Sequence, residues 1–206
     1  MVEATALVLA GGRSRRMGRD KRFLQVEGET LLKRTFDLAQ EACRNVKVLI
    51  SEPEDGKRIS KALGLPSAPP QGESPLVADS RPGSGPLAAV REAAAHCTAA
   101  WILVLAVDYP ALTSGFLEGL LERAQDLAES NLALVPQSGG RLQYACALYR
   151  RSALLKLARR NDPPSSFRSW LEDQPAVVVW AEEEWRPLAS PDTLVNWNRP
   201  GDWRGP

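Results

Sequence analysis

Histidine, methionine and cysteine are scarce in this chain of 206 residues, which holds one histidine, two methionines and three cysteines. The cysteines, Cys43, Cys97 and Cys146, are odd in number, far apart and without a CxxC pair, which argues against a disulfide framework and a zinc site. We therefore expect all three to be small buried hydrophobes. His96 lies at the far end of an expected helix, and we expect a structural role for it.

The chain also lacks a long hydrophobic run and an excess of either charge. No apolar stretch approaches the roughly 20 residues that span a bilayer, and the N-terminus carries no basic leader. With 26 basic and 25 acidic side chains, the formal net charge is +1. We therefore expect a cytoplasmic protein without a membrane or nucleic-acid partner. The length suits one α/β domain, so we expect residues 1–206 to form a single domain.

Positive charge is nevertheless concentrated behind a glycine turn near the N-terminus. A short apolar run ends at Gly11 and Gly12, and five of the next nine residues are basic: Arg13, Arg15, Arg16, Arg19 and Lys21. Glycines let backbone N–H groups approach phosphate oxygens, and a triphosphate needs several basic side chains around it. The motifs GxxxxGK[ST] and GxGxxG are both absent. The segment therefore indicates either a small-anion site of another kind or a solvated basic loop.

Short apolar segments alternate with amphipathic ones along the chain. We expect strands at 5–9, 45–51, 76–79, 101–107, 131–137, 143–149 and 176–181, with helices between them, the first capped by Thr30. This alternation is typical of a mostly parallel sheet covered on both faces, because parallel strands need crossover connections. Ligands bind at the carboxyl ends of such strands, so we expect Gly11, Gly12, Asp79 and Asp108 along one rim.

The segment LAGGRSRRMGRDK (9–21) resembles the signature of the nucleotidyltransferases that activate sugars and cofactors. More narrowly, it resembles the molybdenum cofactor guanylyltransferases. Three later segments resemble the same family in the same order: VAD with SGPLAAV, LAVDYP, and LVNWNRPGDW (194–203). The resemblance covers about residues 5–203. It implies a Rossmann-like three-layer α/β/α nucleotidyltransferase fold and transfer of GMP from GTP to the terminal phosphate of molybdopterin, with release of pyrophosphate.

The resemblance assigns the nucleoside to the ends of the first strands. It implies that the guanine and the ribose are recognised along the backbone of Leu9, Ala10, Gly11 and Gly12. Asp79 falls in the guanine nucleotide site, where the alternative is an aspartate that initiates a turn. Ser51 ends the second strand, at a place where family members often have an asparagine near the base.

The phosphates and the metal are assigned to a second set of residues. The resemblance implies that Lys21, Arg13 and Arg16 hold the phosphates and that Asp108 binds Mg²⁺. A surface ion pair with Asp20 or Glu27 is the alternative for Lys21, and helix capping is the alternative for Asp108. The acceptor phosphate is already ionised at neutral pH, so the reaction needs no general base. Asn196 and Asn198 match the family's closing segment.

The chain departs from the family pattern at several positions. Ala89 and Arg199 replace a glycine and a threonine, and Gln143, Tyr144 and Ala145 stand where the family often has HPT in the strand facing the pterin. Gly12 favours GTP, because cytidylyl relatives typically have alanine near this point. Three alternatives stay open: a cytidylyltransferase, a transferase for another phosphorylated acceptor, and a non-catalytic nucleotide-binding or cofactor-delivery protein. The expected partners are GTP, the pterin, other cofactor biosynthesis proteins and acceptor molybdoenzymes.

Overall fold

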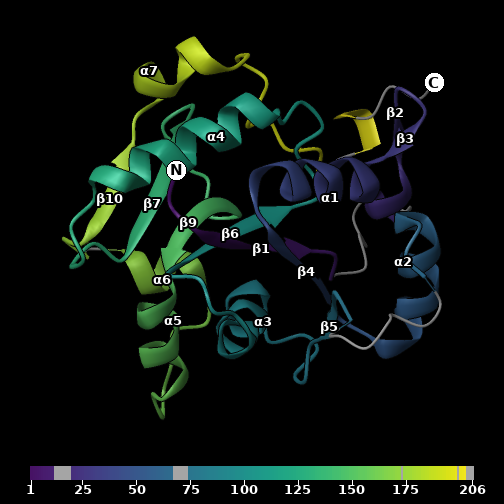
Figure 1. Ribbon diagram of the computed structural model, residues 1–206, viewed down its shortest axis with the longest axis horizontal. Coiled ribbons are helices and arrows are strands. Elements are labelled where there is room, and N and C mark those ends of the chain that lie inside the picture. Colours follow the sequence, from purple (N-terminus) through teal and green to yellow (C-terminus); the bar gives the residue numbers. More distant parts are fainter. Residues whose placement is uncertain (12–19, 67–73, 173, 199, 203–206) are drawn as a thin grey trace.

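A computed structural model describes residues 1–11, 20–66, 74–172, 174–198 and 200–202, and it is built around one large sheet (Figure 1). The strand order is β10-β7-β9-β6-β1-β4-β5, and β8 pairs with β7. The strands are β1 (Ala4–Leu9), β4 (Asn45–Ile50), β5 (Leu76–Ala78), β6 (Trp101–Ala106), β7 (Ala133–Ser138), β8 (Arg141–Leu142), β9 (Cys146–Arg150) and β10 (Val177–Trp180). Strand β9 is antiparallel to both of its neighbours, β6 and β7. The pairs β10–β7, β6–β1, β1–β4 and β4–β5 are parallel, which confirms a mostly parallel sheet.

Side chains of the strands alternate between two cores, one on each face of the sheet. In β1, Ala6 and Val8 belong to the first core and Leu7 to the second, as the period of two in a strand requires. The first core is covered by α1 (Leu31–Ala42), α2 (Gly56–Leu63), α4 (Ser114–Arg123) and α7 (Glu182–Trp185). The second is covered by α3 (Pro86–Ala93), α5 (Arg151–Ala158) and α6 (Phe167–Leu171), on the other side of the sheet in Figure 1. The predicted three-layer α/β/α fold is confirmed.

Local sequence signals set several helix boundaries. The Thr30 hydroxyl accepts a hydrogen bond from the Lys33 N–H at 3.2 Å and caps α1, as predicted. Helix α2 ends at Gly64, whose φ of 68° is a left-handed conformation that glycine adopts without strain. Pro86 begins α3, where its missing N–H costs no helical hydrogen bond.

Two features differ from the sequence-based expectation. The strand expected at 143–149 starts only at Cys146, because the Cys146 N–H donates to the Gln143 carbonyl at 3.0 Å and closes a turn there. A small hairpin of β2 (Gln25–Val26) and β3 (Glu29–Thr30) was not predicted. Its strands have two residues each, too few for an alternating pattern to be visible in the sequence.

The three cysteines are buried and none of them forms a disulfide, which confirms their predicted role as small hydrophobes. Burial raises the pKa of the Cys43 thiol to about 12 and raises that of Cys146 further, because a thiolate is poorly solvated in an apolar interior. Both thiols are therefore protonated and unreactive at neutral pH.

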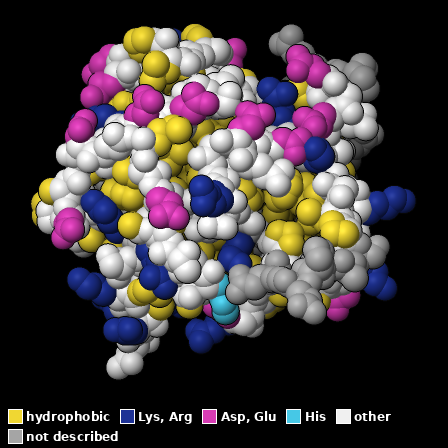
Figure 2. Space-filling view, in the orientation of Figure 1, with side chains coloured by type: hydrophobic (Ala, Val, Ile, Leu, Met, Phe, Trp, Pro, Cys, Tyr) yellow, Lys and Arg dark blue, Asp and Glu magenta, His cyan; other side chains and the backbone are white. Residues whose placement is uncertain are grey.

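The surface carries both signs of charge. Figure 2 shows acidic side chains mainly over the upper part of one face and basic ones mainly over its lower part. Within the described ranges, no helix has the length and apolar character needed to cross a bilayer.

Candidate functional site

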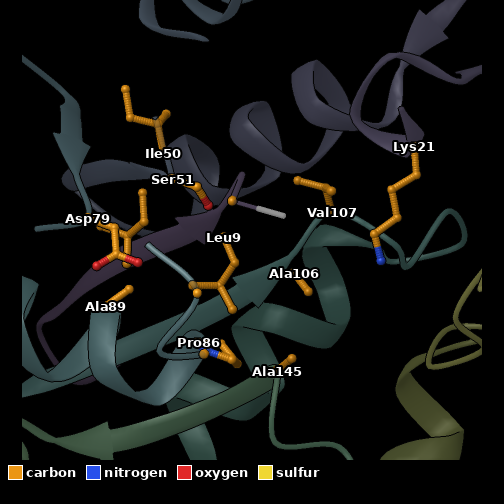
Figure 3. Close-up of a pocket in the computed structure, with 14 residues that line it drawn as sticks. Leu9, Lys21, Ile50, Ser51, Asp79, Pro86, Ala89, Ala106, Val107 and Ala145 are labelled. Atoms are coloured by element: carbon orange, nitrogen blue, oxygen red, sulfur yellow. The ribbon is translucent and has the colours of Figure 1, made fainter. Parts of the chain in front are cut away.

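A cavity of about 330 Å³ opens at the carboxyl ends of β1, β4, β5 and β6, beside the first turn of α3 (Figure 3). Five of the predicted site residues line it: Leu9, Gly11, Lys21, Ser51 and Asp79. They come from distant parts of the chain and meet because parallel strands end at the same edge of the sheet. The structure thus brings these five residues together, and their individual roles stay predictions.

The cavity has a different charged group at each end. In Figure 3, the Asp79 carboxylate and the Lys21 ammonium lie on opposite sides, with Leu9 and Ala106 between them. The intervening wall is largely apolar. A mostly apolar cavity with a few placed polar groups is typical of sites for small organic ligands. Here the ligand should carry hydrogen-bond donors at one end and negative charge at the other.

At the end of the cavity opposite Asp79, Lys21 forms an ion pair with Asp108. The Lys21 Nζ lies 2.6 Å from Asp108 Oδ2, and the two side chains are 23% and 9% exposed. Lys21 belongs to a short 3₁₀ turn, η1 (Lys21–Phe23), and Asp108 follows the end of β6. The alternative for Lys21 was a surface ion pair with Asp20 or Glu27. The structure instead pairs Lys21 with Asp108, and the ammonium lies at the cavity (Figure 3).

The second oxygen of Asp108 is a buried acceptor. Among the described residues, Asp108 Oδ1 has no hydrogen-bond partner. Leaving a buried polar atom unpaired costs about 1–3 kcal/mol, so such atoms in native structures often indicate a site for a ligand, a water or an ion. Within the same residues, no group of three or more histidine, cysteine, aspartate or glutamate side chains gathers to hold a metal. Asp108 is not one of the residues that line the cavity; it adjoins the cavity through Lys21, and its role as a metal ligand stays a prediction.

Gly11 and Ser51 are in close contact at the edge of the cavity. A Cβ atom added at Gly11 would lie 2.5 Å from Ser51 Oγ, closer than such atoms approach. A glycine at position 11 therefore lets the ends of β1 and β4 come together, and it leaves backbone exposed to the cavity.

Asp79 both stabilises the turn that follows it and lines the cavity. Its Oδ1 accepts a hydrogen bond from the Arg81 N–H at 2.8 Å, so the carboxylate shapes the turn after β5, as expected of an aspartate that initiates a turn. The same side chain lines the cavity. The two positions are compatible because a carboxylate has several acceptor sites.

Other predicted residues lie away from the cavity or outside the described residues. Ala10 is fully buried, does not line the cavity, and its carbonyl accepts a hydrogen bond from Arg22 Nη1 at 2.9 Å. Its carbonyl thus already has one partner within the protein, and its predicted role toward the nucleoside stays a prediction. The other predicted positions Gly12, Arg13 and Arg16 lie outside the described residues, as do Arg15, Arg19 and Arg199.

The terminal segment lies against Asp108. The Trp197 N–H donates to the Asp108 carbonyl at 2.9 Å, and Asn196 is hydrogen-bonded to the Tyr109 side chain. The Tyr109 hydroxyl also lies 3.2 Å from Gln143 Oε1. Asn196, which matches the family's closing segment, and Gln143, which departs from the family pattern, therefore both contact Tyr109. Tyr109 directly follows Asp108.

Several cavity residues were not predicted from the sequence. They include Gly83, Gly85 and Pro86 in and after the turn that follows Asp79, and Ala89 and Ala145, which the sequence showed only as departures from a pattern. Gly85 has φ 88°, a conformation open to glycine, and it caps α3. The glycine before Pro86 is the signal in the sequence that could have indicated a backbone placed close to a ligand.

The mostly parallel α/β/α sheet, with its cavity at the carboxyl ends of the strands, has the fold of solved nucleotidyltransferases. Solved structures with the same fold include molybdopterin-guanine dinucleotide biosynthesis protein A from Archaeoglobus fulgidus, with a TM-score of 0.69 and 22% identity. That comparison covers 96% of this chain and 94% of the other. A nucleotidyl transferase from Methanothermobacter thermautotrophicus gives a TM-score of 0.68 at 21% identity, covering 97% and 94%.

Sequence comparison narrows the class to one family. Residues 6–178 match the MobA-like NTP transferase domain, and the chain belongs to this family. A probable molybdenum cofactor guanylyltransferase from Synechococcus elongatus is 34% identical over 203 residues, which cover 97% of this chain and 95% of that protein. A probable molybdenum cofactor guanylyltransferase from Opitutus terrae is 35% identical over 205 residues, covering 95% and 90%. The family resemblance in the sequence is thus confirmed.

Proposed function

We propose that this protein transfers GMP from GTP to the terminal phosphate of molybdopterin and releases pyrophosphate, which makes the guanine dinucleotide form of the cofactor. The observation that carries the proposal is the cavity with Asp79 at one end and the Lys21–Asp108 pair at the other. The relatives named molybdenum cofactor guanylyltransferase support this reaction over transfer of CMP and over transfer to a different phosphorylated acceptor.

We place the guanine base at the Asp79 end. Guanine presents an N–H and an amino group on one edge, and a carboxylate accepts hydrogen bonds from both. One Asp79 oxygen already accepts from the Arg81 backbone, and the other oxygen is the acceptor we assign to the base. The exposed backbone at Gly11 and the Ser51 hydroxyl lie along the cavity between this end and Lys21, where the ribose would pass.

We place the phosphates at the Lys21 end, together with Mg²⁺. The residues present fit this ion, because Mg²⁺ keeps several waters and binds through one or two carboxylates plus substrate phosphates. The unpaired Asp108 Oδ1 is the carboxylate oxygen we assign to it. When bound, Mg²⁺ would neutralise charge on the phosphates of the nucleotide. Lys21 contributes a second, fixed positive charge beside them.

The protein's own part in the reaction is positioning rather than proton transfer. The acceptor phosphate is ionised at neutral pH and attacks the α-phosphorus directly, so no base is required. His96 is exposed at the end of η3 (Ala94–His96), which follows α3 at the end away from the cavity. We assign the acceptor side to the group of Tyr109, Gln143 and Asn196, which adjoins Asp108.

The remaining expectations belong to the same proposal. Residues 1–206 act as one nucleotidyltransferase domain in the cytoplasm. Other cofactor biosynthesis proteins supply the pterin, and molybdoenzymes receive the product.

The nucleotide assignment predicts selective stabilisation by GTP. A ligand that binds only the native state raises the unfolding midpoint, by an amount equivalent to about 2.7 kcal/mol at a hundred times its dissociation constant. Thermal unfolding with Mg²⁺ and each of GTP, ATP, CTP and UTP should therefore show the largest shift with GTP. An Asp79→Asn variant should lose most of this selectivity. A larger shift with CTP would assign the protein to the cytidylyl branch, and equal shifts would reject the role of Asp79.

A further inference from the structure

Arg22, the residue after Lys21, has a buried guanidinium, with its side chain 4% exposed. It makes four side-chain hydrogen bonds. Nε and Nη2 donate to the two Asp20 oxygens at 2.8 and 2.7 Å, and Nη1 donates to Asp55 Oδ2 at 2.8 Å and to the Ala10 carbonyl at 2.9 Å. The contact with Asp20 is bidentate, the geometry in which an arginine fixes a carboxylate most firmly.

These contacts join three separate segments. Ala10 follows β1 directly before Gly11, Asp20 caps η1, and Asp55 ends η2 (Pro53–Asp55), which leads into α2. Ala10 and Asp20 also flank the segment 11–19, which carries Gly11 and Gly12 and most of the basic residues of the signature. Arg22 therefore ties Ala10 to Asp20 and joins both to Asp55 at the start of α2.

The charges around Arg22 account for its burial. Two carboxylates, Asp20 and Asp55, offset one guanidinium, and Arg58 adds a second positive charge 3.4 Å from Asp20 while lying 3.7 Å over the Phe23 ring. Burial alone would raise the pKa of Asp20, but the hydrogen bonds and charge of Arg22 lower it below its usual value. Removing Arg22 would leave the buried Ala10 carbonyl unpaired, would take away the ion-pair partner of Asp55, and would leave Asp20 with the more exposed Arg58.

Lys21 and Arg22 leave the same turn in different directions. Successive side chains of a 3₁₀ turn are about 120° apart, since the turn has about three residues. Arg22 reaches toward Ala10 and α2, whereas Lys21 reaches Asp108 at the cavity. The anchoring of Arg22 thus determines the backbone position from which the Lys21 ammonium reaches Asp108.

We infer that Arg22 is a positioning residue for nucleotidyl transfer, which acts through Lys21 by holding η1 against the end of β1 and the start of α2. This inference rests on the proposed role of Lys21 in binding the phosphates. Misplacing a reacting group by about 1 Å can cost about 100-fold in rate. The expected loss in Arg22→Met is therefore about 10- to 100-fold in kcat, with a smaller rise in the KM for GTP.

A double-mutant cycle separates positioning from general destabilisation. Transfer rates and GTP dissociation constants are measured for wild type, Arg22→Met, Lys21→Met and the double variant. If Arg22 acts through Lys21, adding Arg22→Met to Lys21→Met should cost less than about 3-fold more, because the group being positioned is already gone. Arg22→Lys, which keeps the charge but loses the bidentate fork, should recover part of the rate and replaces Arg22→Met if that variant does not fold.

Arg150 provides the matched control. Its guanidinium also donates to the backbone carbonyls of Leu127 and Ala128 and lies 4.0 Å over the Trp101 ring. Arg150 pairs with the first residue of β6, at the end of that strand away from the cavity. Arg150→Met should lower the unfolding midpoint and leave kcat within about 2-fold.

Losses that multiply in the double variant, or equal kcat values for Arg22→Met and Arg150→Met, would overturn the inference. If wild type transfers GMP and the losses in rate of the two single variants multiply in the double variant, only the role of Arg22 is rejected. A wild type that neither binds GTP nor transfers GMP rejects the proposed function and this inference together.

Discussion

Replacing Asp108 with alanine is expected to lower the rate of GMP transfer by about 1,000-fold or more. Asp108 supplies the carboxylate oxygen assigned to Mg²⁺ and the partner of Lys21, and a catalytic metal contributes several kcal/mol of charge stabilisation. Each 1.4 kcal/mol corresponds to a tenfold change in rate. The measurement is single-turnover transfer from GTP at saturating Mg²⁺.

Asp108→Asn supplies the isosteric comparison. The amide keeps the volume and an oxygen that can accept from Lys21, but it lacks the charge that a hard cation requires. Its transfer rate should fall nearly as far as that of the alanine variant. Without nucleotide, both variants should unfold within a few degrees of wild type, because the native carboxylate is partly unsatisfied in the folded protein. Turnover that stays within tenfold of wild type in a folded Asp108→Asn variant would reject the metal assignment.

Replacing Lys21 with methionine is expected to weaken GTP binding about 10- to 100-fold and to slow transfer by at least as much. The methionine keeps the length of the side chain but removes the ammonium, and hydrogen bonds to charged groups contribute about 1.5–3 kcal/mol each. Binding is measured by calorimetry with GTP and Mg²⁺, and the rate by the transfer assay. Because the charge on the leaving pyrophosphate increases during the reaction, the loss in kcat should exceed that in affinity.

Lys33 is the matched control for Lys21. Its ammonium is also paired with a carboxylate, that of Asp37, but the pair lies on α1 and its side chains are 34% and 35% exposed. Lys33→Met should change neither GTP affinity nor transfer by more than about 2-fold, since exposed ion pairs contribute little. Equal effects of the Lys21 and Lys33 substitutions would mean that the basic segment is only a solvated surface.

Much of the fold could be predicted because its signals are local. The apolar runs of β1 and β6 stop where the strands end, and Thr30 and Gly64 mark helix boundaries through their own side chain or backbone conformation. The strand expected at 143–149 was partly wrong because a turn between Gln143 and Cys146 depends on pairing with other strands, which the apolar pattern does not show.

The site was predictable only in part, for the same reason. Gly11 and Asp79 follow predicted strands, so the rule that ligands bind at carboxyl ends placed them along one rim. Leu9 and Ser51, which also line the cavity, were assigned by family resemblance. Asp108 lies 87 residues from Lys21, and their ion pair was not predicted, because the resemblance assigned the two residues separately, to the metal and to the phosphates.

Arg22 shows what remained hidden. In the sequence it is one more basic residue after Lys21, and its partner Asp55 lies 33 residues away. Arginine is almost never fully buried unless it is paired, so neither composition nor periodicity indicates a guanidinium in the interior. Ala10 was assigned to the nucleoside by its position in the signature, whereas the structure turns its carbonyl toward Arg22.

The central claim is that GMP is joined to molybdopterin, and the most direct test is to follow the label. Wild-type protein is incubated with Mg²⁺, molybdopterin and GTP labelled at the α-phosphorus. The labelled pterin product is separated and counted, and the unlabelled pyrophosphate is quantified by an enzyme-coupled assay. The account predicts one labelled GMP on the pterin for each pyrophosphate released, and no comparable product with CTP. Label that stays out of the pterin while GTP binds, or that enters it from CTP instead of GTP, would contradict the proposed reaction.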